Sequence, residues 1–275
     1  MRTIFLSLIT FFFLIATGHS EDKVLVERMY STLRINEILS ILSGEGISSG
    51  ELMADGQGGL SSSAGWTERL EEIYSVNKMD KDLRQFFNNV ANLKQVKNAL
   101  DFFETSLGKK ITEKEISARL LLEDQRLKSA TTIFVKKLKV EQPDIIKLYE
   151  KLIDANDHLE NNISGIMNSN LAFYRGFASV PKNDGDTLSE DEILRIVMND
   201  QERIRKEVEQ WLINFSSVAY ESLSKSDLYR YISLSRSPGG LFLNKVINQS
   251  LEAVFESQSF NLGRTTAEFL QKDDT

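Results

Sequence analysis

Apolar residues recur at every third or fourth position over most of this chain. The stretches 142–178 and 193–219 show this spacing most clearly. Their apolar positions are Ile145, Leu148, Leu152, Leu159, Ile163, Ile166 and Leu171 in the first, and Ile193, Val197, Ile204, Val208, Trp211, Phe215 and Val218 in the second. On a helix of about 3.6 residues per turn each set forms one stripe. The pattern predicts long amphipathic helices that share a core.

The starts and breaks of these helices are also marked. Pro143 suits the first turn of a helix, and Ser189 with Glu192 three residues later forms the pattern of a capping box. The chain has only three prolines and no alternating apolar and polar run bounded by turns, so we predict an all-α helical bundle. The glycine- and serine-rich stretch 43–65 is expected to be a flexible loop or a short helix between loops, and 180–187 a turn.

One short phrase occurs twice. "FFETSLGKK" follows a helical segment in the first half, and "LSRSPGGLF" does so in the second. The motif positions are Phe102, Phe103, Thr105, Ser106 and Gly108 in the first copy and Ser237, Pro238 and Gly240 in the second. The shared order is an apolar helix end, a hydroxyl residue, Ser or Pro, any residue, and then glycine.

Each position of the phrase has a physical role at the junction of two helices. Thr105 and Ser237 can accept hydrogen bonds from the free amides of the following helix as N-caps. Pro238 suits the first helical position, where no N–H is needed. Gly108 and Gly240 each cost roughly 1 kcal/mol of helix stability against alanine, which indicates a close approach of backbones. We interpret the phrase as a capped bend rather than an anion site.

The phrase resembles the F-Y-x-S-P-x-G motif of a domain-of-unknown-function family of exported, mainly periplasmic bacterial proteins. The second copy keeps the Ser-Pro-x-Gly core, whereas the first has Thr105-Ser106 in place of Ser-Pro. The resemblance implies an exported helical fold and assigns no catalytic residue. Two copies indicate a duplication, with related halves at 22–138 and 139–270.

The N-terminus has the layout of a secretory signal peptide. Arg2 is followed by an apolar run and then by small residues, so we place the signal at 1–20 with cleavage after Ser20. The run is shorter than the roughly 20 apolar residues that span a bilayer, and no later stretch is long enough. A chain without cysteine forms no disulfides, which suits the periplasm of a Gram-negative bacterium better than an animal secretory route.

The charge of the chain argues against nucleic-acid binding. Its formal net charge is −7, and an acidic protein repels phosphates unless it has a dense basic patch. Only Lys109-Lys110 and the stretch 136–139 are basic, and both are expected to be solvated helix faces. No cofactor or metal motif is present, so we predict none.

Candidate catalytic residues are few. His158 is the one histidine after the predicted signal, and it is expected on a solvated helix face. Paired carboxylates could hydrolyse a glycosidic bond in the cell wall. The candidates for such pairs are Glu113, Glu115, Glu190, Asp191 and Glu192. Glu115 is the most interesting of them, because it follows the first bend in an otherwise apolar helix.

Three functional hypotheses remain. The leading one is a non-enzymatic binding protein that takes a protein partner or an apolar ligand into a groove between helices. A carboxylate-based cell-wall glycoside hydrolase and a periplasmic chaperone-like factor are the alternatives.

Overall fold

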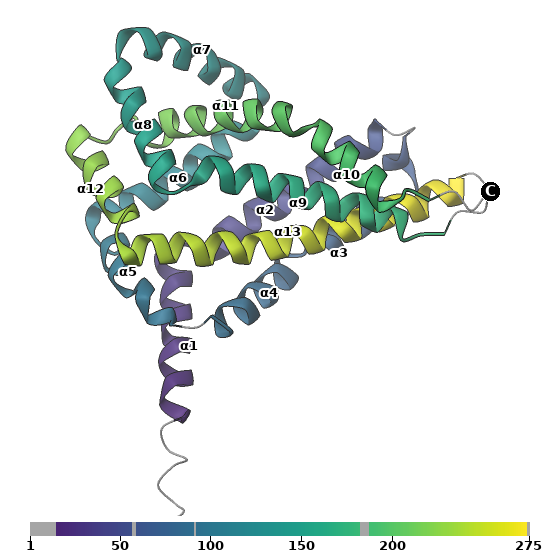
Figure 1. Ribbon diagram of the computed structural model, residues 1–275, viewed down its shortest axis with the longest axis horizontal. Helices are drawn as coiled ribbons and strands as arrows, with labels where there is room; N and C mark the ends of the chain where they lie inside the picture. Colours follow the sequence, from purple (N-terminus) through teal and green to yellow (C-terminus); the bar gives the residue numbers. More distant parts are fainter. Residues whose placement is uncertain (1–14, 57–58, 91, 182–186, 274–275) are drawn as a thin grey trace, which may run out of the picture.

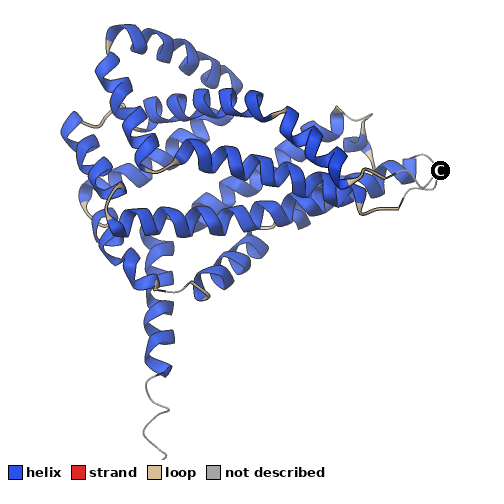
Figure 2. Ribbon diagram, in the orientation of Figure 1, coloured by secondary structure: helices blue, strands red, loops and turns tan. Residues whose placement is uncertain are grey.

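The chain is helical throughout the part that its structure describes. This computed structural model describes residues 15–56, 59–90, 92–181 and 187–273, which form helices joined by short loops with no strand among them (Figure 2). The prediction of an all-α bundle is therefore confirmed. The elements are α1 (Ile15–Thr32), α2 (Ile35–Asp55), η1 (Leu60–Ser62), α3 (Trp66–Ile73), α4 (Val76–Asn88), η2 (Leu93–Val96), α5 (Lys97–Phe103), α6 (Ser106–Glu123), α7 (Gln125–Glu141), α8 (Pro143–Ala155), α9 (His158–Ala178), α10 (Glu190–Asn199), α11 (Gln201–Ala219), α12 (Lys225–Ser235) and α13 (Pro238–Asp273).

The N-terminal helix runs through the predicted cleavage point. Residues 1–14 of the predicted signal lie outside the described residues, and α1 continues from Ile15 past Ser20 without a break. It projects from the body of the molecule (Figure 1), and from Leu25 onward its inner side joins the main core. Within the described ranges no helix combines the length and apolar character that a membrane crossing needs. The signal peptide itself remains a prediction.

Two long helices, α9 and α13, lie side by side along the molecule (Figure 1). They run parallel, because Asn168 contacts Glu252 near their middles and Gly176 meets Phe260 further along both. A Cβ atom at Gly176 would overlap the carbonyl of Phe260, and one at Gly263 would overlap the carbonyl of Phe173. Glycine is therefore required at both positions for the two backbones to come this close.

The two predicted halves share one hydrophobic core. The main cluster of buried side chains runs from Leu25 to Val254 and takes members from both 22–138 and 139–270. A smaller cluster joins α2 and α3 to the far end of α13, where Trp66 is fully buried with its ring 5.3 Å from that of Phe269. Because both halves contribute side chains to the main core, neither half buries its apolar helix stripes without the other.

The expectation of a flexible loop or a short helix between loops at 43–65 is wrong for most of its length, because a long helix covers it up to Asp55. Helix α2 continues this far, because two of its glycines give room to α3: a side chain at Gly46 would overlap Tyr74, and one at Gly50 would overlap Leu70. The packing gained outweighs the poor helix propensity of glycine. In the predicted turn at 180–187, residues 182–186 lie outside the described residues.

The repeated phrase forms the same capped bend twice. At the α5–α6 junction, Thr105 Oγ1 accepts from the amide of Gly108 at 3.1 Å. At the α12–α13 junction, Ser237 Oγ accepts from the amide of Gly240, also at 3.1 Å. A Cβ atom on either glycine would overlap the last turn of the preceding helix. Both helices can therefore turn sharply and still pack against the helix before them.

Candidate functional site

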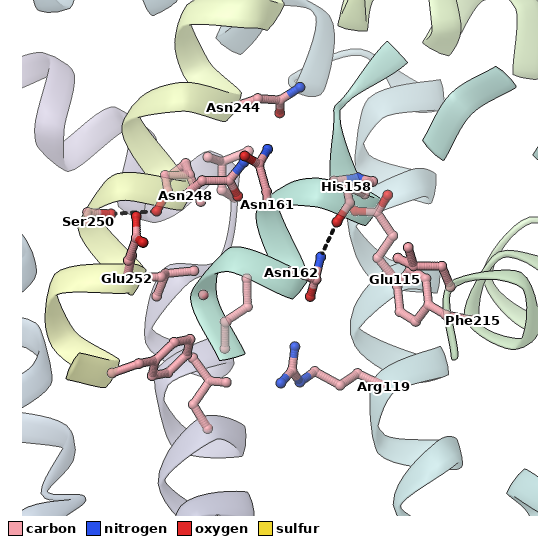
Figure 3. Close-up of a pocket in the computed structure, with 18 of the residues that line it drawn as sticks. Glu115, Arg119, His158, Asn161, Asn162, Phe215, Asn244, Asn248, Ser250 and Glu252 are labelled. Atoms are coloured by element: carbon pink, nitrogen blue, oxygen red, sulfur yellow. Dashed lines mark hydrogen bonds between the residues drawn. The ribbon is translucent and has the colours of Figure 1, made fainter. Parts of the chain in front are cut away.

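A cavity of about 570 Å³ lies between the helices of both halves. Its walls come from α2, α6, α9, α11 and α13, and Figure 3 shows ten of its lining residues by name. One wall is apolar, with Ile38 and Leu42 from α2 and Trp211 and Phe215 from α11. The wall formed by α9 and α13 carries polar side chains. The cavity therefore has the two-sided character of a site for a small molecule.

Glu115 is a half-buried residue of α6 that lines this cavity. Its Oε1 accepts hydrogen bonds from the phenols of Tyr220 at 2.7 Å and Tyr231 at 2.9 Å. Burial raises the pKa of Glu115 above its usual value of 4.5, and the two phenol hydrogen bonds oppose that rise. Among the described residues Glu115 has no ion pair with a cation. The net effect shifts the carboxyl toward its neutral form.

The first phrase positions this cluster. Thr105 caps α6 and sets its direction, which turns Glu115 inward on the same stripe as Ile111 and Ile116. The ring of Phe102 stacks on Tyr231 at a centroid distance of 6.2 Å, and that of Phe103 meets the same ring edge-on at 6.0 Å. The aromatic pair of the motif thus holds the tyrosine that binds Glu115. The sequence signalled Glu115 and missed both tyrosine partners, which lie in the other half.

The expectation that His158 lies on a solvated face is wrong. It is the first residue of α9, after Asp157 in the left-handed conformation, and its side chain lines the cavity (Figure 3). Burial lowers the pKa of His158 to about 4, against the opposing charge of Asp157. At neutral pH the imidazole is therefore uncharged and provides one donor and one acceptor.

The polar residues that follow His158 line the cavity with it. Asn161 and Asn162 lie three and four residues after it, Gly165 lies three residues after Asn162 and Ser169 four after Gly165, and all of them line the cavity. On a helix these positions form one stripe. Sequence reasoning missed this surface because polar residues at helical spacing normally face water. Here the polar stripe of α9 faces inward.

Helix α13 completes the polar wall. Asn244 and Asn248 both line the cavity, and Asn244 donates to Asn156. Glu252 accepts from Asn168 of α9 at 2.6 Å. Amide side chains donate and accept, so this wall can match hydroxyl or amide groups of a ligand.

The one cation on the cavity wall is paired within the described structure. Arg119 lies one turn after Glu115 on α6, and both of its contacting nitrogens reach Glu45 of α2, at 2.5 and 2.7 Å. This two-point pairing occupies the guanidinium and joins α6 to α2. It therefore leaves Glu115 without a neutralising partner.

The other carboxylates proposed for catalysis do not share a cleft with Glu115. Glu113 is exposed on the opposite side of α6. Glu190, Asp191 and Glu192 are exposed at the start of α10, where Glu190 pairs with Arg175 and Glu192 closes the predicted capping box with Ser189. Their roles are in capping and surface pairing. Within the described residues no group of three or more His, Asp or Glu side chains is placed to hold a metal ion.

Comparison of the chain with family models, with curated proteins and with solved structures finds no match. A function must therefore be inferred from the chemistry of the cavity.

Proposed function

We propose that this protein binds a small, uncharged, amphipathic molecule in the cavity between α2, α6, α9, α11 and α13, without catalysing a reaction. The observation that carries the proposal is the inward-facing polar stripe of α9, from His158 to Ser169. The side chains of this stripe are half-buried, and Asn161 and Asn162 each donate one hydrogen bond to a backbone carbonyl, of Asn156 and His158 respectively. Their remaining polar groups need hydrogen-bond partners wherever water is excluded. A ligand with hydroxyl or amide groups along one side would supply those partners.

Size and lining support a small ligand over a protein segment. The cavity volume of about 570 Å³ falls within the roughly 300–1,000 Å³ of ordinary ligand pockets. The apolar wall of α2 and α11 faces the polar wall of α9 and α13. A molecule with an apolar body and a row of polar groups would satisfy both walls at once.

The electrostatics of the cavity favour an uncharged ligand. The pKa of Glu115 is raised and that of His158 is lowered, so burial drives both groups toward their neutral forms. Arg119 is neutralised by Glu45. A ligand anion would lose its hydration with no free cation on the described cavity wall, because Arg119 is paired with Glu45. The carboxylate of Glu252 also lines the cavity, where it accepts a hydrogen bond from Asn168. The carboxyl of Glu115 and the neutral ring of His158 would instead form hydrogen bonds with an uncharged ligand.

Glycoside hydrolysis has weaker support. It needs a second carboxylate roughly 5–10 Å from the first across the scissile bond, and the carboxylates predicted besides Glu115 lie on the surface. Glu252 also lines the cavity, but it is held by a hydrogen bond from Asn168. We further propose that the protein acts in the periplasm after removal of residues 1–20. The signal-like N-terminus supports that location.

A single substitution can fill the cavity without disturbing the core. Gly165 lies inside α9 and lines the cavity, and a Cβ atom placed on it meets nothing within 4 Å. Gly165→Leu should therefore occupy ligand space while favouring the helix, since leucine is a better helix former than glycine. Gly44→Leu is the matched control, because Gly44 is also helical with open space around it but is exposed on α2.

The test is to express residues 1–275 in a Gram-negative host and to analyse the native protein by mass spectrometry before and after solvent extraction. We expect wild type and Gly44→Leu to carry the same small molecule and Gly165→Leu to lack it. Binding of the uncharged fluorescent probe N-phenyl-1-naphthylamine should follow the same order. Equal probe binding by all three proteins, with no extracted molecule, would refute the proposal.

A further inference from the structure

Helix α7 presents a face that the body of the protein leaves uncovered. It lies at the edge of the molecule (Figure 1) and packs inward through Thr131, Val135 and Leu138. On its outer side Ile133 is 69% exposed and Val140 is 81% exposed. Large aliphatic side chains this exposed are unfavourable in water, and two of them on one helix face call for a contact.

The same face of α7 is basic. Arg126, Ile133 and Val140 follow one another at intervals of seven residues, so they align along the helix, and Lys136 and Lys137 fall between the two aliphatic residues on that face. The helix has five basic side chains and one carboxylate, a formal charge of +4, on a chain whose net charge is −7. Positive charge is therefore concentrated at this edge of an acidic protein.

Part of this charge is free to pair with a partner. Lys137 is 3.6 Å from Glu141, and Arg126 is 3.1 Å from Asp124. Lys136 and Lys139 are exposed and form no ion pair among the described residues. The stretch 136–139 was expected to be a solvated face, and solvation does not account for the exposed Ile133 and Val140 on either side of its lysines.

We propose that α7 is a docking surface for an anionic lipid bilayer, on which it lies parallel to the membrane plane. A convex helix face with apolar side chains among lysines suits the boundary between headgroups and acyl chains. Ile133 and Val140 enter the acyl boundary, while Lys136 and Lys137 extend toward lipid phosphates along their apolar stems. The acidic remainder of the protein is repelled by the same surface, which orients the α7 edge toward it.

This surface is separate from the ligand cavity, since α7 contributes no residue to the cavity lining. The two proposals can therefore fail independently. If both proposals hold, the docked protein would exchange its amphipathic ligand with the bilayer. The docking itself is inferred from α7 alone.

The test is flotation of the full chain with vesicles of phosphatidylcholine alone or of phosphatidylcholine and phosphatidylglycerol in equal parts. We expect binding to the anionic vesicles only, lost at high salt. The double variants Ile133→Ser/Val140→Ser and Lys136→Glu/Lys137→Glu should each bind at least about tenfold more weakly. Circular dichroism should show unchanged helix content in both, because all four side chains are exposed.

Matched controls lie on other helices. Leu52→Ser removes an aliphatic side chain that is 73% exposed on α2, and Lys78→Glu/Lys81→Glu reverses two exposed lysines on α4. Both controls should bind anionic vesicles like wild type. Absent binding, or binding that the α7 variants do not change, would overturn the proposal. A third outcome would also overturn it. If the chain does not bind vesicles but captures a protein from a periplasmic extract through α7, then α7 is a protein interface.

Discussion

Tyr231 of α12 donates its phenolic hydrogen to Glu115 of α6 across 2.9 Å, although 116 residues separate the two in sequence. Phe102 and Phe103, from the first copy of the repeated phrase, pack on the ring of that tyrosine. The first bend therefore orients the helix that carries Glu115 and also supports the ring that binds it. This connects an architectural motif to the candidate site.

The raised pKa of Glu115 predicts how stability depends on pH. Between the usual value of 4.5 and the raised folded value, the unfolded carboxyl is ionised while the folded one is protonated. The folded state then binds more protons, so its stability falls as pH rises through this window. Glu115→Gln keeps an acceptor for the tyrosines and does not titrate. We expect the variant to gain stability relative to wild type as pH rises from about 4.5, measured by urea unfolding at several pH values.

The control for this prediction is Glu113→Gln, which alters an exposed carboxylate on the same helix. Its unfolding free energy should run parallel to that of wild type over the whole pH range. A constant difference between Glu115→Gln and wild type at every pH would show that burial does not shift the titration of Glu115.

His158 predicts a pH dependence of the opposite sign. Its pKa falls from 6.5 in the unfolded chain to about 4 in the fold, so between these values the unfolded state binds the additional proton. Stability should therefore decrease as pH falls from 6.5 toward 4, by at most about 3 kcal/mol at 1.36 kcal/mol per pKa unit. His158→Asn should remove this part of the pH dependence. An NMR titration of the imidazole checks it directly, and a midpoint near 6.5 would contradict the burial of His158.

The glycines of the two bends should be intolerant of alanine. In a helix alanine is normally better than glycine by roughly 1 kcal/mol. At Gly108 and Gly240, however, the added methyl would overlap the backbone of the preceding helix, and we expect a loss of about 1–3 kcal/mol. Gly44→Ala, in open space on α2, should show the ordinary gain. Thermal unfolding of the three variants measures this, and a stabilised Gly108→Ala would mean that the helices do not approach so closely.

Much of the fold follows from local sequence signals. The apolar stripes of 142–178 and 193–219, the capping box at Ser189 and the caps at Thr105 and Ser237 all act within a few residues, so their spacing reveals them. The length of α2 does not follow, because its glycines are accommodated by the distant residues Leu70 and Tyr74. The matched bends support the predicted duplication, which stays a prediction.

The candidate site was less predictable than the fold. Glu115 could be singled out, since a carboxylate on an apolar helix stripe is unusual. Its partners Tyr220 and Tyr231 could not, because only tertiary packing brings them near. His158 was expected on a solvated helix face, because residue spacing alone does not show which face of a polar helix is turned toward the rest of the protein. The buried face of α9 is set by its close packing on α13, which depends on Gly263 in α13 and on Gly176 in α9.

The contact between α9 and α13 gives the last prediction. A methyl at Gly263 would overlap the carbonyl of Phe173, so Gly263→Ala should push the two helices apart at the end distant from His158. We expect a loss of about 1–3 kcal/mol from overpacking, together with faster amide hydrogen exchange along the second half of α9, since the packing that protects those amides is weakened. Gly165→Ala, also within α9 but facing the cavity, should lose neither stability nor protection. Equal exchange in both variants would show that the close crossing does not hold α9 in place, and the inward orientation of its polar stripe would then need another cause.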